Sequence, residues 1–287
     1  MGIRKILVPL SGKLGDEAVL STACGVAKNF QAQVVGLFVR PDPAEALPYL
    51  GDGVTGRVIE DILTTVKEGS DEASKKAQTA LEKVAGEQGL PVASDTQGPL
   101  PACRFLDIMG RADDVIAAQS RLSDLVVFGH GMNDEGEAGG SALEAAMMSA
   151  GRPVMIAPRQ VPETIGGTVA IGWDSSYEAA HAVTAAMPFL AKASRCVILC
   201  VDRDTAEAKP GSTLADYLKL HGIEADVEAM KAGDNSVGEV LLDGAQNVGA
   251  DLLVMGGYGH SRLRELFVGG TTRHIRSHPV LPVLMAH

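Results

Sequence analysis

The chain has 287 residues, of which 46% are hydrophobic and 21% charged, so it can bury a core and does not have the composition of a disordered protein. Its formal net charge of −11 disfavours binding to nucleic acid or to an anionic membrane surface, because both depend on clustered Lys and Arg. The apolar runs are too short for a membrane span or a signal peptide, which predicts a cytoplasmic protein.

The first half of the sequence alternates short apolar strands with Ala-rich helical stretches, the pattern of an α/β domain. A long helix with mixed polar and apolar faces is expected from about Arg57 to Gln88, after a loop at Pro41–Gly56. Five strands are expected, at roughly 3–9, 33–39, 92–96, 124–129 and 153–157.

The second half repeats this organisation after a segment rich in proline and glycine, Gln160–Gly167, which is interpreted as a linker. Only a short helix near Leu214–His221 stands where the first half has its long one. Its five strands are expected at 168–173, 196–201, 224–230, 251–256 and 281–286.

Three pairs of segments indicate an internal duplication. KILVPLS matches TVAIGWD, SDLVVFG matches ADLLVMG, and RPVMIAP matches LPVLMAH. The predicted fold class is therefore α/β, with two consecutive doubly wound domains at 1–159 and 166–287. Each is expected to hold a five-stranded, mostly parallel sheet with helices on both faces.

Glycine clusters follow the fourth strand of the second copy. Gly256 and Gly259 come first, and Gly269 and Gly270 follow a helical stretch. Because glycine lets the backbone come close to a ligand, these amides can converge on phosphate oxygens at the carboxyl edge of the sheet. The alternative is that the glycines only turn the chain between strand and helix.

The run MGGYGHSRLRELFVGGTT resembles the nucleotide-binding signature of the universal stress protein family, which is Gly, two residues, Gly, nine residues, Gly, then Ser or Thr. Gly256, Gly259 and Gly269 match this spacing. Gly270 departs from it, because the hydroxyl residue, Thr271, comes one place later. The resemblance covers both copies and implies the tandem form of the family.

The resemblance implies that the second copy binds ATP with Mg²⁺. Asp174 stands where the family has an Asp that contacts the base, and the adenosine would lie between this residue, Trp173 and Val201. His260, Ser261 and Arg262 would lie at the mouth, where Arg262 would either pair with a terminal phosphate or remain a solvated helix charge. The phosphate path would be lined by Met255, Gly256, Gly259, Gly269, Gly270 and Thr271.

The first copy departs from the signature. Met132 replaces the second glycine, and Ser11 replaces the Asp after the first strand. Acidic residues at 134, 135 and 137 stand near the expected phosphates and would repel an anionic ligand. We therefore expect no triphosphate site in this copy.

The sequence lacks a Walker A motif, a dinucleotide-binding GxGxxG and a GxSxG elbow, and no metal site or catalytic residue is predicted from it. The favoured interpretation is a universal stress protein with a regulatory nucleotide. The alternatives are a slow ATPase or nucleotidyl-transferring enzyme, for which only His260 and Asp174 are candidates, and an interaction scaffold that binds no nucleotide. A protein partner is expected but not identified. The resemblance implies that the last strands of the two copies pair as an intramolecular pseudo-dimer, and a further homodimer is possible.

Overall fold

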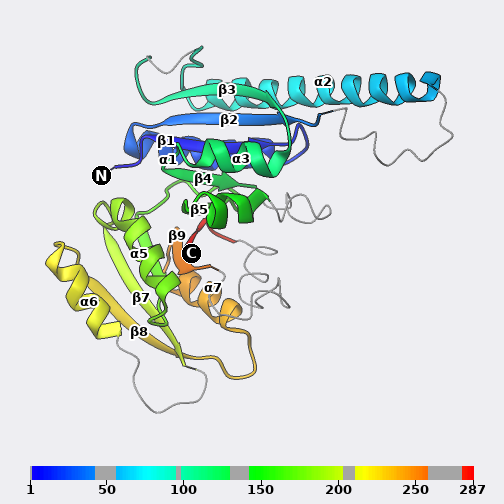
Figure 1. Ribbon diagram of the computed structural model, residues 1–287. Helices are drawn as coiled ribbons and strands as arrows, with labels where there is room; N and C mark the ends of the chain where they lie inside the picture. Colours follow the sequence, from blue (N-terminus) through cyan, green and yellow to red (C-terminus); the bar gives the residue numbers. More distant parts are fainter. Residues whose placement is uncertain (1, 43–55, 95–97, 130–141, 203–210, 258–279) are drawn as a thin grey trace.

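The computed structural model describes residues 2–42, 56–94, 98–129, 142–202, 211–257 and 280–287. Its strands form one ten-stranded sheet in the order β3-β2-β1-β4-β5-β10-β9-β6-β7-β8 (Figure 1). The strands are β1 (Lys5–Leu10), β2 (Gln33–Arg40), β3 (Ala102–Met109), β4 (Leu125–Phe128), β5 (Val154–Ile156), β6 (Thr168–Gly172), β7 (Arg195–Asp202), β8 (Ala225–Lys231), β9 (Leu252–Gly256) and β10 (Val283–Ala286).

The sheet consists of two parallel halves that meet at one antiparallel pair. In each half the first strand lies between the second and the fourth, so the strand order 3-2-1-4-5 is used twice. β5 and β10 join the halves, with Met155 opposite Leu284. This is the pairing that the sequence analysis expects of the two closing strands, and it removes two exposed strand edges. The α/β class with five mostly parallel strands in each copy is confirmed.

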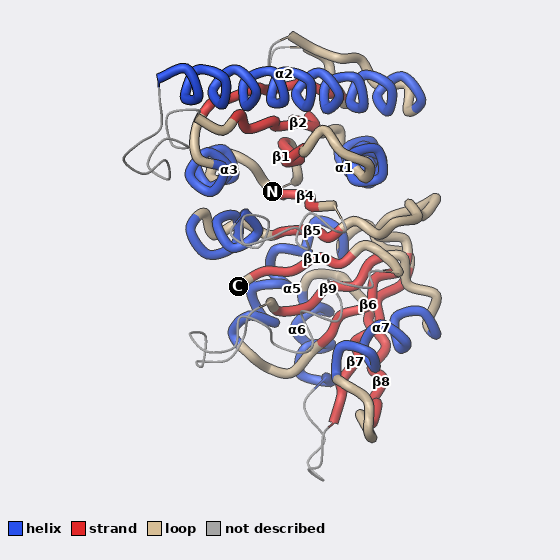
Figure 2. Tube along the Cα trace, turned by 90° about the vertical axis from the view of Figure 1, so that its right-hand side faces the viewer, coloured by secondary structure: helices blue, strands red, loops and turns tan. Residues whose placement is uncertain are grey.

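Helices cover both faces of this sheet (Figure 2). One face packs under α1, α2, α5 and α6, and the other under α3, the π-helical segment η2 and α7. No helix in the described ranges is long and apolar enough to cross a membrane. The helices are α1 (Asp16–Phe30), α2 (Gly56–Glu87), α3 (Ala112–Ser120), η2 (Ala145–Ser149), α5 (Tyr177–Leu190), α6 (Gly211–Leu220) and α7 (Val237–Asn247).

The expected third strand of the first copy, at 92–96, is wrong. The strand is β3, ten residues further along the chain, and Val92 forms only an isolated bridge to Cys103. The first copy inserts a loop between its long helix and β3, whereas the second copy runs from α6 into β8 after a short turn. The apolar residues after the helix therefore predict the strand too early.

Equivalent aspartates anchor the first strand of each half. Asp124 accepts hydrogen bonds from the amides of Arg4 (2.8 Å) and Lys5 (2.9 Å). Asp251 accepts from the amides of Gly166, Gly167 and Thr168 at 2.9–3.1 Å. The two aspartates occupy matching places in SDLVVFG and ADLLVMG, so the duplication extends to this contact.

Replacing Asp251 with Ala is expected to destabilise the protein by ~2–3 kcal/mol, because three part-buried amides lose their acceptor. Chemical denaturation measures this free energy of unfolding. Asp226→Ala is the control, since Asp226 forms only an exposed ion pair with Arg195 and should cost less than ~1 kcal/mol. Equal losses in the two variants would contradict the anchoring role.

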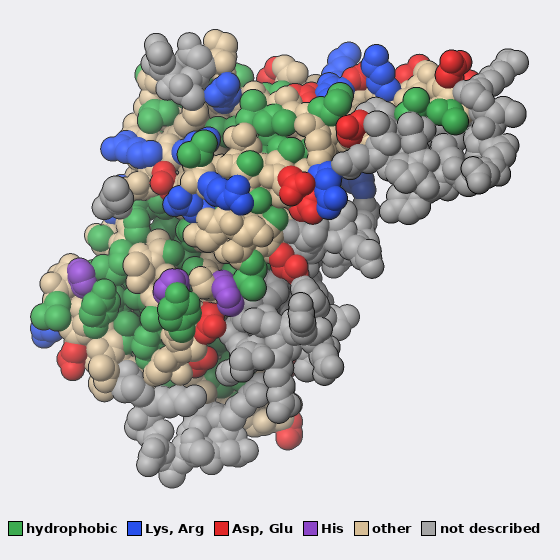
Figure 3. Space-filling view, viewed as in Figure 1, with side chains coloured by type: hydrophobic (Ala, Val, Ile, Leu, Met, Phe, Trp, Pro, Cys, Tyr) green, Lys and Arg blue, Asp and Glu red, His purple; other side chains and the backbone are tan. Residues whose placement is uncertain are grey.

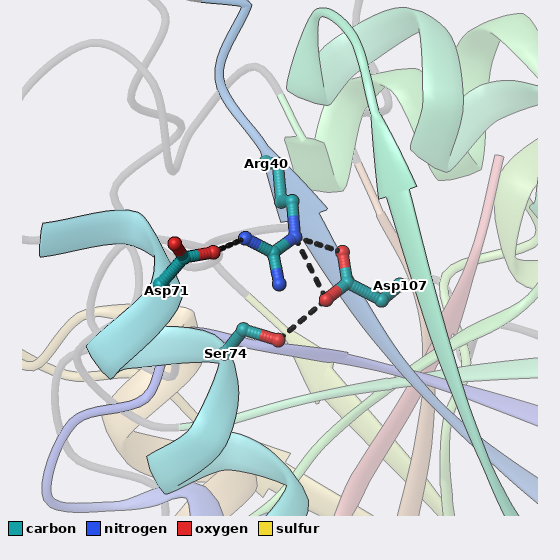
Figure 4. A network of polar contacts seen from close by, with 4 residues as sticks. All are labelled: Arg40, Asp71, Ser74 and Asp107. Carbon is teal, nitrogen blue, oxygen red and sulfur yellow. Dashed lines mark hydrogen bonds and ion pairs between the residues drawn. The ribbon is translucent and has the colours of Figure 1, made fainter. Parts of the chain in front are cut away.

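The long helix α2 lies along the edge strands and runs on past the end of β2 (Figure 1). A polar network fixes it there (Figure 4). Arg40, the last residue of β2, donates from Nε to both oxygens of Asp107 on β3, at 2.7 and 2.9 Å, and pairs with Asp71 on α2. Ser74 of α2 donates to the same Asp107 carboxylate. Partial burial of Asp107 opposes its ionisation, but the bonds from Arg40 and Ser74 prevail and lower its pKa.

Contacts between α1 and α5 hold the two halves together next to the β5–β10 pair. The rings of Phe30 and Phe189 pack edge to face with centroids 4.9 Å apart, and the ammonium group of Lys192 lies 4.8 Å from the Phe30 centroid. Asn29 donates from Nδ2 to the carbonyl of Ile165 at 3.1 Å. The apolar core is continuous from one half to the other on this face of the sheet.

Candidate functional site

The strand order reverses between β6 and β9 in the C-terminal half, and doubly wound sheets bind ligands at the carboxyl edge of such a point. β6 pairs in parallel with both β9 and β7, so the carboxyl ends of all three strands meet at one edge. The structure therefore brings together the predicted residues that end these strands: Trp173, Asp174, Val201, Met255 and Gly256.

The remaining predicted residues lie outside the described ranges, in the segment 258–279 that begins after Gly257. Their roles stay predictions. They are Gly259, His260, Ser261, Arg262, Gly269, Gly270 and Thr271.

Trp173 is half-buried at the end of β6. Its amide donates to the carbonyl of Leu199 on β7 at 2.9 Å, and its side chain packs against the apolar core. The indole Nε1 is buried and has no hydrogen-bond partner in the described part of the chain. A buried N–H without an acceptor is costly, so Trp173 is the described residue of this edge whose polar group is least well satisfied.

Asp174 shapes the turn between β6 and α5. Its Oδ1 accepts from the amide of Ser176 at 2.9 Å, and Ser175 between them has a left-handed backbone, with φ of 64°. The Ser176 hydroxyl then caps α5 by accepting from the amide of Ala179 at 3.1 Å. Asp174 thus uses one oxygen to hold the turn and remains exposed at the strand end.

Gly256 is required by packing rather than by a left-handed backbone. A Cβ at this position would lie 2.7 Å from the amide nitrogen of Ala179 and 2.8 Å from the carbonyl carbon of Glu178. The end of β9 therefore touches the backbone of the first turn of α5. This close approach of strand and helix brings the amides of the α5 N-terminus to the edge of the candidate site.

Gly257 follows β9 and lies next to the seam, the place where the β5–β10 pair joins the two halves. Its amide donates to the carbonyl of Ala286 at 2.9 Å, and its own carbonyl lies 3.2 Å from Nδ1 of His287. A Cβ here would lie 2.7 Å from Cε of Met147, which belongs to the N-terminal half. Both halves of the molecule therefore hold the residue from which the glycine-rich segment departs.

The corresponding turn of the N-terminal half is filled by a carboxylate of the chain itself. Asp16, the first residue of α1, is 3% exposed. It accepts from the amide of Gly12 at 2.8 Å, from the amide of Ser11 at 3.2 Å, and from the Ser11 hydroxyl at 3.1 Å. The amides of Ser11 and Gly12 after β1 are therefore already bonded within the chain.

The helix α2 closes the same turn from outside. Gly12 has a left-handed backbone, with φ of 72°, and a Cβ there would overlap the carbonyl oxygen of Ala73 on α2. The short α6 has no such extension in the C-terminal half. The two carboxyl edges thus differ, because the described part of the N-terminal edge is covered by its own helix.

Asp16→Ala is expected to destabilise the protein by ~1–3 kcal/mol, because the amides of Ser11 and Gly12 lose a buried acceptor. Burial raises the pKa of Asp16 above 3.8 despite these hydrogen bonds. A raised folded pKa gives a contribution to stability that is fully present below the unfolded pKa and is lost as pH rises through the folded value. Urea denaturation at several pH values measures the free energy of unfolding of wild type and variant. The difference between these two free energies should become smaller as pH rises from about 4. A difference in unfolding free energy that grows with pH would contradict a raised pKa of Asp16.

Comparison with known proteins finds a family match in the C-terminal half. The model of the universal stress protein family matches residues 167–287. This stretch, less than half of the chain, is therefore similar to a universal stress protein domain. A comparison with curated protein sequences finds no match.

Solved structures extend the similarity in fold to the whole chain. A universal stress protein from Archaeoglobus fulgidus superposes with a TM-score of 0.66 at 17% identity, over 98% of this chain and 97% of that one. A putative universal stress protein from Pseudomonas aeruginosa gives a TM-score of 0.56 at 13% identity, over 98% and 92% of the two chains. The two halves therefore have the fold of a tandem universal stress protein.

Several residues that shape the carboxyl edges of the two half-sheets are not predicted from the sequence. Asp16 resembles an ordinary first-turn acid of a helix, and nothing in the sequence shows that its carboxylate turns back to Ser11 and Gly12. The contact between Gly257 and Met147 joins residues from different copies. Only Ser176 has a recognisable signal, as a serine directly before a helical stretch.

Proposed function

We propose that this protein is a stress-response regulator in the cytosol that binds one adenine nucleotide, ATP with Mg²⁺, at the carboxyl edge of its C-terminal domain. The observation that carries the proposal is the difference between the two edges. The N-terminal turn is filled by Asp16 and covered by α2, whereas the C-terminal one has a buried indole N–H without a partner among the described residues. The glycine spacing of the sequence falls on that same C-terminal edge.

Each described residue has a role in this proposal. Trp173 offers its Nε1 and a flat apolar surface to the nucleoside, and the exposed Asp174 accepts from the base or the ribose. Gly256 brings the β9 end against α5, whose first-turn amides favour negative charge. The backbone amides of the glycine-rich segment would hold the phosphates, and Mg²⁺ would neutralise part of their charge.

The chain offers a direct test, because Trp173 is its single tryptophan. Mg·ATP is expected to change the intrinsic fluorescence of the nucleotide-free protein in a saturable way, and the phosphate released in the same sample should stay near background. If the fluorescence does not change and equilibrium dialysis detects no bound nucleotide, the protein is better explained as an interaction scaffold. Rapid phosphate release would favour the enzyme.

Asp174→Ala tests the role of the carboxylate that remains exposed at the strand end. It is expected to weaken nucleotide binding about tenfold, which corresponds to ~1.4 kcal/mol for one lost hydrogen bond to the ligand. Ser11→Ala is the matched control, since Ser11 occupies the same place in the N-terminal copy, and it should leave the affinity unchanged. Equal losses in the two variants would place the nucleotide elsewhere.

A further inference from the structure

A cavity of about 210 Å³ lies at the seam between the two halves, outside the predicted nucleotide site. The loop before β5 contributes Gly151 and Arg152, the outer face of α5 contributes His181 and Thr184, and the end of β10 contributes His287. Figure 3 shows histidine side chains on the face where the halves meet, with side chains of both Lys or Arg and Asp or Glu nearby.

Arg152 is held in place but leaves hydrogen-bonding capacity unused. Its Nη2 donates to the carbonyl of Arg121 at 2.8 Å, which fixes the guanidinium. Its Nε is buried without a partner among the described residues and is not open to the cavity. No carboxylate lies within ion-pair distance of Arg152 in the described ranges, so its charge is not compensated there. An uncompensated guanidinium beside a cavity is a strong attractor for an oxyanion.

Two histidines and Thr184 also line the cavity. The Nδ1 of His287 lies 3.2 Å from the Gly257 carbonyl, and since a carbonyl only accepts, this nitrogen carries the proton. The ring of His181 stacks on Tyr177 with centroids 4.1 Å apart, which fixes its position over the cavity. The Thr184 hydroxyl donates to the Ala180 carbonyl at 3.0 Å and is left as an acceptor.

We propose that this seam cavity is a second binding site, specific for a phosphate-sized oxyanion that is held by Arg152, His181 and His287. Neither Asp nor Glu is among the side chains that line it in the described structure. The volume exceeds the ~10–15 Å³ that one water molecule needs many times over, so a phosphate group or a phosphate monoester fits. The site does not depend on nucleotide binding and would be present in the nucleotide-free protein.

Calorimetric titration of the nucleotide-free full chain with inorganic phosphate, at constant ionic strength in chloride, tests this proposal. One saturable site is expected. Arg152→Met and His181→Gln should each weaken it at least tenfold. Arg152→Met also loses the hydrogen bond to the Arg121 carbonyl, which can destabilise that variant. His181 is exposed, so His181→Gln is expected to keep the fold and provides the cleaner test.

His221→Gln is the matched control, because His221 stacks on Tyr217 of α6 as His181 stacks on Tyr177, but lies outside the cavity. It should bind phosphate like the wild type. Gly259→Asp separates the two sites, since phosphate held by the glycine-rich segment would be lost in this variant and phosphate held at the seam would remain. Absence of saturable binding, an equal loss in His221→Gln, or loss in Gly259→Asp would each overturn the proposal.

Discussion

Gly259→Asp is expected to lower the affinity for Mg·ATP about 100-fold or more. Gly259 is the second glycine of the signature, where the backbone has to approach the phosphates, and an aspartate would add both a side chain and a negative charge. A loss of this size corresponds to ~3 kcal/mol of binding free energy. The free energy of unfolding should change by no more than ~0.5 kcal/mol, because the substitution is directed at the ligand and not at the core.

Met132→Asp is the matched control for this substitution. Met132 stands at the equivalent place in the N-terminal copy and receives the same side chain. Nucleotide affinity, measured by calorimetric titration, should be unchanged in this variant. Unchanged affinity in Gly259→Asp, or a loss in Met132→Asp, would contradict the assignment of the nucleotide to the C-terminal domain.

Phe189→Ala is expected to destabilise the whole molecule by ~3–5 kcal/mol, because the side chain is 1% exposed and its removal leaves a cavity between the two halves. The edge-to-face contact with Phe30 on α1 is part of this loss. Since the core is continuous across the seam, urea denaturation should show a single transition in the wild type and in the variant. Two separate transitions would mean that the halves unfold independently.

A double-mutant cycle separates the contact between the halves from the simple loss of buried surface. Phe30→Ala combined with Phe189→Ala should show a coupling of ~0.5–1.5 kcal/mol, as expected for an aromatic pair. Phe38, buried in the N-terminal half at 5% exposure, serves as the control. Phe38→Ala combined with Phe189→Ala should be additive within ~0.5 kcal/mol.

The alternation of apolar strands and helices predicts most of this fold from the sequence. Buried parallel strands such as β1 and β6 are continuous apolar runs, and their equal spacing to β2 and β7 identifies the duplication. The position of β3 is predicted wrongly because β3 is an edge strand with a mixed pattern of burial. Its apolar pattern is therefore weaker than that of a central strand. The loop before it has no counterpart in the second copy.

The candidate site is only partly predictable, for a physical reason. The residues of the C-terminal edge lie at the ends of apolar strands, so Trp173 and Gly256 can be found by position and spacing. The closure of the N-terminal edge depends on which donors Asp16 faces, and the seam cavity joins Arg152, His181 and His287 from both halves. Contacts between segments that are distant in the sequence produce no periodic pattern by which they could be predicted.

Calorimetric titration of the nucleotide-free chain with Mg·ATP is the most direct test of one nucleotide site in the C-terminal domain. One site per chain, lost in Gly259→Asp and retained in Met132→Asp, is the expected result. Two equivalent sites would contradict the closure of the N-terminal edge by Asp16 and α2, and absence of binding would contradict the nucleotide site itself.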